Sequence, residues 1–432
     1  MTRKAAIVGG SLTGLAAGIP LRRVGWDIDI FERSSQNLSD RGAGIVMQPE
    51  TLELLRLCGA TSTDEVGVML ERRKYLGRDG SVLSEQRMPQ LMTSWGLLYL
   101  RFRSAFPSEH YHLGHAGASF EENGSSVTFL FENGAATRAE LVVAADGFRS
   151  AARAKLLPDV RPTYAGYVAW RGVVPEEEVS KEIKNVFANC FTFYQMNHSH
   201  SLCYFIPGEN GETAPGSRRL NWVWYWNVPE ADLDELLTDR DGVRHSYAIA
   251  PGLLHPRQEE RQREIADRVL APPFAALVRA TKEPFVQAIL DLECLQMAFG
   301  RIALAGDASF IVRPHTAAST SKGVANAFAL AEQLADGTDV PGAVSPENSI
   351  WQLRTATRSP SQGLSHSAKS TILHIPRGAS ISRSILCDCR PTQLPIVRQI
   401  SLCLGALNRQ RSDFLRLHAD SYDEVPRLAE MR

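Results

Sequence analysis

One segment near the start of the chain, KAAIVGGSLTGLAAG, constrains the fold more than any other. Its apolar beginning predicts a short buried strand, and a helix is expected to start near Leu12. Gly9 permits a tight turn between the two, and Gly14 permits the helix to pack closely against the strand. Ser11 takes the place of a middle glycine. Because the first N–H groups of a helix lack intrahelical partners, this turn predicts a site for a pyrophosphate and thus for a dinucleotide.

A second predicted strand, DIDIF, is followed directly by Glu32, about twenty residues beyond the glycine turn. A carboxylate in that position accepts hydrogen bonds from the two hydroxyls of an adenosine ribose. The alternative is an ordinary strand–helix turn without a ligand, and the spacing of Glu32 argues against it.

Two later segments also combine a buried strand with an aspartate at its end. ELVVAADGFRSAAR reaches Asp146 and Gly147, followed by Ser-x-x-Arg, and RIALAGDASF reaches Gly306 and Asp307. A carboxylate at a strand end accepts short charge-assisted bonds from the hydroxyls of a polyol chain. For Asp307 the alternative is an ordinary N-cap of the next helix.

Together these three segments resemble those of the class A flavoprotein monooxygenases, the single-component FAD-dependent aromatic hydroxylases. DRGAGIVMQPETLELL, YHLG, YVAWRG, YFIPG, NWVWYWNV and RPHTAASTSKG are similar to the dihydroxypyridine hydroxylase (2,6-dihydroxypyridine 3-monooxygenase) branch, in which His-Thr-Ala replaces a Gly-x-Gly loop. The resemblance covers residues 1 to about 335. It implies an α/β fold with a Rossmann-like FAD-binding domain and an inserted antiparallel-sheet substrate domain, as in para-hydroxybenzoate hydroxylase.

The resemblance also implies which residues bind FAD. A flavin ring is flat and wide, so the chain along its edge must lack bulky side chains, as Ala317 and its neighbours do. The next helix would direct its positive N-terminus at the flavin. His315 either bonds to the flavin or fills space, and Arg41 and Gln48 either face the flavin or lie in a solvated loop. The implied contacts are Gly9, Ser11, Leu12 and Gly14 at the pyrophosphate, Glu32 and Arg33 at the adenosine, Asp307 at the ribityl chain, and Arg41, Gln48, Asp146, Pro314, His315, Thr316 and Ala317 elsewhere.

Between residues 161 and 228 the sequence changes to short strands and holds four of the seven tryptophans. In NWVWYWNV, side-chain alternation puts Trp222 and Trp224 on one sheet face. That aromatic face is expected to cover a substrate pocket, together with Trp170 and Tyr204 from neighbouring strands. The alternative is that these rings are only sheet core.

For the reaction, the resemblance implies insertion of oxygen from O2 into an electron-rich aromatic or heteroaromatic ring, through a flavin C4a-hydroperoxide. NADH or NADPH is the expected reductant, and it would bind transiently because the sequence holds no second dinucleotide fold. The protein must help to remove a proton from the substrate hydroxyl, for which His315, Tyr204 and Arg171 are the candidates. Two other interpretations stay open, an impaired FAD-binding protein without turnover and a NAD-dependent dehydrogenase.

Net charge and cysteine pattern limit which partners and which compartment are expected. The net charge is -1, so no overall field would draw the chain to nucleic acid or to a membrane. The seven cysteines form no CxxC pair, and the chain begins with neither a signal peptide nor a long apolar run, which predicts a cytoplasmic protein. His110, His112 and His115 lack a matching ligand set, so no metal is expected. A homodimer is compatible with this composition.

Changes in composition and hydrophobic periodicity along the chain predict the domain borders. The FAD-binding domain is expected to comprise residues 1–65, 97–160 and 285–340, and the substrate-binding sheet domain residues 66–96 and 161–284. The remaining residues, 341–432, are serine-rich, poor in acids and without sustained helical periodicity before the final turns. This composition predicts an atypical region that is partly disordered or of aberrant origin.

Overall fold

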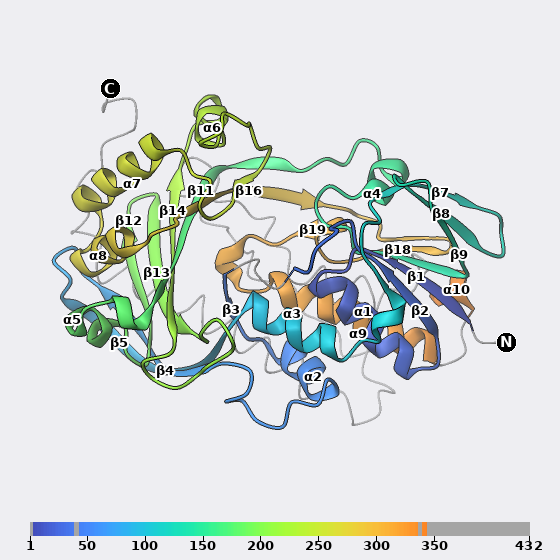
Figure 1. The fold of residues 1–432 in the computed structure, drawn as a ribbon, viewed down its shortest axis with the longest axis horizontal. Coiled ribbons are helices and arrows are strands. Elements are labelled where there is room, and N and C mark those ends of the chain that lie inside the picture. The colour runs from blue at the N-terminus through green and yellow to red at the C-terminus, as the bar shows by residue number, and fades with distance from the viewer. Residues whose placement is uncertain (1–2, 39–42, 336–338, 344–432) are drawn as a thin grey trace, which may run out of the picture. The chain divides into compact units, whose positions relative to one another are not determined.

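The strand predicted at the start of the chain lies within a mostly parallel sheet. The computed structural model describes residues 3–38, 43–335 and 339–343. The strands of this first sheet are β1 (Lys4–Val8), β2 (Asp27–Phe31), β6 (Tyr111–His112), β10 (Leu141–Ala144), β17 (Ala298–Phe299) and β18 (Ile302–Leu304). Their spatial order is β17-β18-β10-β1-β2-β6 (Figure 1), and all neighbours are parallel except β17 and β18.

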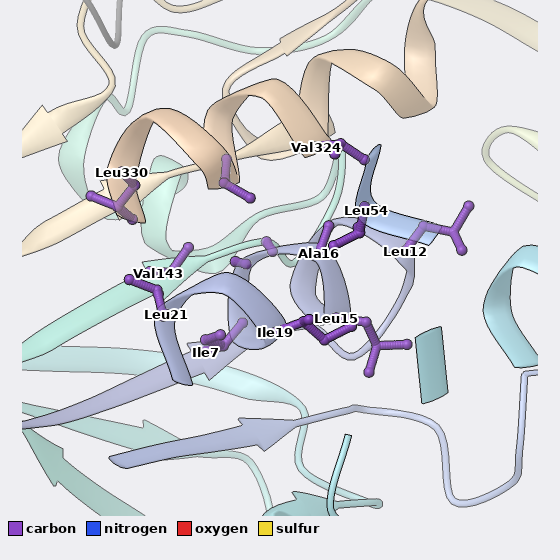
Figure 2. Close-up of a cluster of buried hydrophobic side chains, with 14 of the residues drawn as sticks. Ile7, Leu12, Leu15, Ala16, Ile19, Leu21, Leu54, Val143, Val324 and Leu330 are labelled. Carbon is purple, nitrogen blue, oxygen red and sulfur yellow. The ribbon is translucent and has the colours of Figure 1, made fainter. Parts of the chain in front are cut away.

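Helices cover one face of this sheet. They are α1 (Leu12–Arg23), α2 (Pro49–Leu57), α3 (Trp95–Ser104), α9 (Ser319–Ala335) and the short α10 (Val340–Ala343). Figure 2 shows Val324 and Leu330 of α9 beside α1, with Leu54 of α2 in the same cluster. Leu15 and Leu21 of α1 have no exposed surface, because α1 is held between the sheet and α9. Burial of each such side chain contributes roughly 1.5–3 kcal/mol, which fixes the start of α1 against the strand ends.

A small sheet and one helix close the other face. The sheet consists of β7 (Gly117–Glu122), β8 (Val127–Phe131) and β9 (Ala136–Ala139), and the helix is α4 (Ala151–Leu156). Phe129 of β8 is fully buried in a cluster with Val142 and Ile302 of the parallel sheet.

The short strands predicted after residue 161 form part of a ten-stranded sheet. Its members are β3 (Gly44–Val46), β4 (Val68–Leu76), β5 (Val82–Ser94), β11 (Thr163–Pro175), β12 (Cys190–Met196), β13 (Ser199–Ile206), β14 (Arg219–Asn227), β15 (Ala248–Ile249), β16 (Phe285–Glu293) and β19 (Phe310–Ile311). The order is β15-β16-β11-β14-β13-β12-β4-β5-β3, with β19 paired to β16.

One face of the ten-stranded sheet is covered by helices. These are α5 (Lys181–Phe187), α7 (Pro256–Val269) and α8 (Pro272–Ala280), and a further helix, α6 (Glu230–Leu236), follows β14. Figure 1 shows α7 and α8 on the side of the sheet that faces away from α1 and α9. The Tyr194 hydroxyl donates to the carbonyl of Val269 at the end of α7. The opposite face is therefore the one directed toward the parallel sheet.

Three strands from segments assigned to the FAD-binding domain pair in the ten-stranded sheet instead of the parallel one. They are β3, β16 and β19. The sequence of β16 has the alternation of a half-buried strand, which carries no signal for the sheet it joins. The division into two domains otherwise stays a prediction, and residues 344–432 lie outside the described residues. No helix among the described residues is long and apolar enough to cross a membrane.

Candidate functional site

Four neighbouring parallel strands end at one edge of the six-stranded sheet. In spatial order these are β18, β10, β1 and β2, and shortly after their ends come Asp307, Asp146, Gly9 and Glu32. Ligands of open α/β sheets bind outside the carboxyl ends of the strands. The structure thus brings together four segments that are far apart in the sequence, and it does so at the edge where a dinucleotide is expected.

The glycine turn after β1 leaves no room for side chains. Gly9 has φ +105°, and a Cβ atom there would lie 2.2 Å from the carbonyl oxygen of Ala145. A Cβ atom on Gly14 would lie 1.8 Å from the carbonyl oxygen of Gly9. Ser11 precedes α1 in an extended conformation, and its side chain makes no capping hydrogen bond. Leu12 is buried in the core, so only its backbone is offered to a ligand. This narrow cradle with an uncapped helix N-terminus fits the pyrophosphate of FAD.

Glu32 is buried next to this turn. One carboxylate oxygen accepts from the N–H of Gly10 at 2.8 Å, and the other accepts from the N–H of Ser34 at 2.9 Å. The Tyr111 hydroxyl donates to the carbonyl of Gly10 at 2.8 Å. Each carboxylate oxygen can accept a second hydrogen bond, so Glu32 is both anchored and able to receive a ribose hydroxyl. Arg33 is exposed beside it.

Asp307 has a partner that the sequence analysis missed. Lys322 of α9 donates to its Oδ1 at 2.5 Å and also to the carbonyl of Phe310. The lysine side chain is 2% exposed and the aspartate side chain 44%. The available signal was a single lysine within the otherwise uncharged start of α9, at a position that helical periodicity directs inward.

Thr13 joins the same region. Cβ atoms placed on Gly306 and on Gly323 would each lie 2.5 Å from the hydroxyl oxygen of Thr13. These two glycines let α1, the strand end before Asp307 and α9 approach one another closely. Such an approach brings the N-terminal ends of both helices to one place.

Asp146 lies just after the end of β10 and also bonds to the first residue of α4. Its Oδ2 accepts from the N–H of Ala151 at 2.9 Å, while its Oδ1 is buried without a hydrogen-bond partner among the described residues. Burial raises the pKa of this carboxyl group. The backbone of Asp146 lies beside the glycine turn, since a Cβ atom on Gly9 would lie 2.9 Å from the backbone nitrogen of Asp146.

The small-residue loop lies between β19 and α9. Pro314–Thr316 form one 3-10 turn, and Ala317 follows with φ 55° and ψ 24°, a left-handed conformation. The Gln48 amide donates to the carbonyl of Ala317 at 3.3 Å. Gln48 and this loop, both predicted beside the flavin, therefore meet in the structure. Arg41 lies outside the described residues.

The prediction that the tryptophan face of the sheet covers the substrate pocket is wrong, because that face lies against the helices. Trp222 is 1% exposed, and its indole N–H donates to Thr281, at the end of α8, at 2.8 Å. Trp224 is equally buried and donates to Ser199 at 3.0 Å. Trp170 is the cross-strand partner of Trp224 and shares its face. Because these large apolar rings are buried against α8, this face packs under the helices as core rather than over the substrate.

The opposite, more polar face carries the other predicted residues. Arg171 lies opposite Val223, Tyr204 lies opposite Asn221, and His200 lies opposite Tyr225. His200 was missed, although the alternation in HSHSLCYF places it on the face of Tyr204. The backbone N–H of Gly44 donates to the side chain of Asn221 at 2.9 Å.

Several further contacts join this face to the parallel-sheet side. The Tyr247 hydroxyl accepts a hydrogen bond from the side-chain amide of Gln287. The ring of Tyr247 lies 4.4 Å from the ring of Phe148, centroid to centroid. Burial lowers the pKa of His200 to about 4, and the charge of His315 acts in the same direction. Burial raises the pKa of Tyr247 to about 12, and the charge of Asp307 contributes to the rise. His315, although exposed, therefore lies within electrostatic range of the polar face.

The histidines near residue 110 have a structural partner. His110 and His112 bond to the same oxygen of Asp29, at 3.0 and 3.1 Å, and Lys4 bonds to the other oxygen at 2.8 Å. Among the described residues no group of three or more His, Cys, Asp or Glu side chains has the arrangement of a metal site.

The chain is similar to several known proteins. A family profile described as "FAD binding domain-like" matches residues 164–291. The 2,6-dihydroxypyridine 3-monooxygenase of Paenarthrobacter nicotinovorans is 36% identical over 359 residues, which cover 82% of this chain and 87% of that protein. A 6-hydroxynicotinate 3-monooxygenase of Pseudomonas fluorescens is 26% identical and is covered to 82%, against 76% of this chain.

A solved structure agrees with the fold over the same length. The 2,6-dihydroxypyridine-3-hydroxylase from Arthrobacter nicotinovorans superposes with a TM-score of 0.77 at 34% identity, covering 83% of this chain and 89% of that one. The expected α/β fold, with an FAD-binding part and a large antiparallel sheet, is thereby confirmed. The chain therefore belongs to the class A flavoprotein monooxygenases, FAD-dependent enzymes that hydroxylate aromatic rings.

Proposed function

We propose that the substrate is a hydroxylated nitrogen heteroaromatic ring of the dihydroxypyridine kind. The observation that carries this proposal is the polar sheet face, on which Arg171, Tyr204 and His200 lie together. Such a set suits a small flat ring whose oxygens both donate and accept hydrogen bonds. The names of the two relatives, which refer to a dihydroxypyridine and a hydroxynicotinate, support the same class of ring.

We assign the FAD contacts to the carboxyl edge of the parallel sheet. When bound, FAD accepts a hydride from NADH or NADPH and activates O2 for transfer to the ring. The residues assigned to it are Gly9, Ser11, Leu12 and Gly14 at the pyrophosphate, Glu32 and Arg33 at the adenosine, Asp307 at the ribityl chain, and Gln48, Asp146 and Pro314 to Ala317 around the ring. Arg41 remains a prediction from the sequence.

The side chains of the polar face would orient the substrate and move its proton. Burial raises the pKa of Tyr204, so at neutral pH it is a phenol that both donates and accepts hydrogen bonds. His200 is a neutral imidazole at pH 7, because burial lowers its pKa to about 4. Its free ring nitrogen accepts the proton of the substrate hydroxyl, and His315, which is exposed, passes that proton to solvent.

Oxidation of NADH and NADPH in the presence of candidate rings tests the proposal. The holoenzyme should consume the reductant faster with hydroxylated pyridines than with phenols or benzoates, and the product should contain oxygen from labelled O2. Consumption of the reductant without labelled product would favour the alternative, an impaired FAD-binding protein. Faster turnover of a phenol or a benzoate would contradict the substrate class.

Location and assembly are two further properties that we propose. Cytoplasmic location would match the use of NADH or NADPH as reductant. From the net charge of -1 we also expect no nucleic-acid partner, which a binding assay with duplex DNA would test. A homodimer is a possible assembly, which size-exclusion chromatography with light scattering would test.

A further inference from the structure

A chain of hydrogen bonds runs from α3 to the glycine turn that follows β1. The hydroxyls of Tyr99 on α3 and Tyr111 on β6 lie 3.2 Å apart, and the Tyr111 hydroxyl donates to the carbonyl of Gly10 at 2.8 Å. Because that bond uses the proton of Tyr111, Tyr99 is the donor of the pair. The N–H of Gly10 in turn donates to Glu32 at 2.8 Å. Both backbone groups of Gly10 are therefore held by buried side chains.

The two tyrosines are buried and fixed by their neighbours. Tyr99 is 1% exposed and Tyr111 is 8% exposed. The ring of Trp95 stacks on that of Tyr99 with 5.3 Å between the centroids, and the Arg103 guanidinium lies 4.3 Å from the centroid of the Tyr111 ring. Burial raises the pKa of Tyr111, and the bond with Tyr99 and the charge of Glu32 act in the same direction, so the phenol keeps its proton for the carbonyl.

Gly10 has no room for a side chain beside these bonds. A Cβ atom there would lie 2.4 Å from the hydroxyl oxygen of Tyr111 and 2.8 Å from the Cβ atom of Glu32. The absence of a side chain lets the Tyr111 hydroxyl reach the backbone of the turn itself.

The bond to Tyr111 also sets the direction of the next N–H group. The peptide between Gly10 and Ser11 is trans, and the C=O and N–H groups of a trans peptide point in opposite directions. Since the Gly10 carbonyl points at Tyr111, the N–H of Ser11 points away from it. That N–H has no hydrogen-bond partner among the described residues. It belongs to the free donors at the start of α1, which form an anion site.

We propose that Tyr111 is a positioning residue for FAD, which holds the peptide between Gly10 and Ser11 so that the Ser11 N–H donates to the pyrophosphate. This inference rests on the FAD contacts proposed above for the location of the pyrophosphate. Tyr99 contributes by fixing the Tyr111 hydroxyl. Without that hydroxyl the peptide is free to rotate, and the N–H that it presents to the cofactor loses its direction.

Dilution of the full-length holoenzyme, with the released FAD measured by its fluorescence, gives the dissociation constant that tests the inference. Tyr111→Phe removes only the hydroxyl and should raise this constant about tenfold, and Tyr99→Phe should raise it less. Tyr194→Phe is the matched control, because that hydroxyl is also buried and donates to a backbone carbonyl, that of Val269, away from the glycine turn. It should leave the FAD affinity unchanged. Thermal unfolding shows whether each variant is folded.

Substitutions at Ser11 show whether Tyr111 acts through the peptide. Ser11→Pro removes the N–H, and the φ of -73° at this position suits proline. Ser11→Ala removes only the hydroxyl, so the difference between the two variants isolates the N–H. Ser11→Pro should bind FAD at least about tenfold more weakly than Ser11→Ala. In the Ser11→Pro background Tyr111→Phe should cause little further loss, since the two groups act as a unit.

The phosphorus NMR spectrum of the bound FAD gives a signature that a loss of packing alone would not reproduce. Tyr111→Phe and Ser11→Pro should move the same pyrophosphate resonance in the same direction, because both weaken one hydrogen bond, and Tyr194→Phe should not move it. Additive losses of affinity in the double variant, or an unmoved resonance in Tyr111→Phe, would overturn the inference. Failure of the proposed FAD contacts looks different, because in that case Ser11→Pro binds FAD as tightly as Ser11→Ala.

Discussion

Lys322 of α9 and Asp307 after β18 form a hydrogen-bonded ion pair of 2.5 Å whose two members differ greatly in exposure, 2% for the lysine side chain and 44% for the aspartate. The lysine holds one carboxylate oxygen from the inside and leaves the other side of the carboxylate open. A carboxylate fixed in this way can accept the hydroxyl of a polyol chain without losing its own orientation. The pair therefore links the packing of α9 to the site assigned to the ribityl chain.

Lys322→Met is expected to weaken FAD binding by at least about tenfold. Without the lysine, Asp307 keeps its charge, loses its fixed orientation and repels the phosphates of the cofactor. The dissociation constant is measured by fluorescence titration of the apoprotein with FAD. Lys74→Met is the matched control, because Lys74 is also mostly buried but bonds to Val186 on the ten-stranded sheet.

A double-mutant cycle separates this role from simple packing. In an Asp307→Asn background, Lys322→Met should cost much less FAD affinity than in the wild type, since the two residues act as a unit. Equal losses in both backgrounds would show that Lys322 does not act through Asp307.

Ala317→Gly is expected to raise the free energy of unfolding by up to about 1 kcal/mol. Ala317 has φ 55°, a conformation that strains any residue with a Cβ atom, and glycine removes this strain at the expense of some chain entropy. Urea denaturation of the apoprotein measures the change. Ala318→Gly is the control, because φ is not positive at residue 318 and its substitution should only destabilise. A loss of stability in Ala317→Gly equal to that of the control would refute the strain argument.

His200 makes stability depend on pH. Its pKa is lowered to about 4 in the folded protein by burial and by His315, against an ordinary value of 6.5. Between these two values the unfolded chain binds more protons than the folded one, so the free energy of unfolding falls as the pH falls. From pH 7 to pH 5 this one group should remove about 2 kcal/mol.

The variant His200→Gln lacks this titration. Urea denaturation of the wild type and of the variant at both pH values gives the contribution of His200 as a difference of differences, in which other titrating groups cancel. An identical pH dependence in the two proteins would mean that His200 is already exposed to water in the folded state.

Much of the fold was predictable because glycine and strand ends leave clear signals. Gly9 and Gly14 are required by contacts of 2.2 and 1.8 Å that any Cβ atom would make, and such positions are visible in a sequence as a fixed spacing. The order of the strands and the membership of β16 were not visible, because a strand pattern gives burial but not the partner. The location of Arg41 and the organisation beyond residue 343 are still predictions.

The site was only half predictable for a related reason. Side-chain alternation correctly separates Trp222 and Trp224 from their neighbours, but it does not say which face of a sheet meets the cofactor. The structure gives the answer through α7 and α8, which cover the indoles and leave Tyr204 on the other face. Lys322 was missed because its importance depends on Asp307, which precedes it by fifteen residues and belongs to a different element.

The two faces of the sheet should respond differently to substitution. Trp222→Phe removes an indole that is buried under α8 and bonded to Thr281, and it should cost roughly 1–3 kcal/mol of unfolding free energy while the substrate affinity of the holoenzyme stays the same. Tyr204→Phe removes only a hydroxyl from the polar face, so it should lower substrate affinity or turnover at least about tenfold, with stability changed by less than about 1 kcal/mol. Urea denaturation and flavin-monitored substrate titration of both variants give all four values. If Trp222→Phe weakens substrate binding while Tyr204→Phe does not, the polar face is not the substrate face, and the assignment of Arg171 and His200 fails with it.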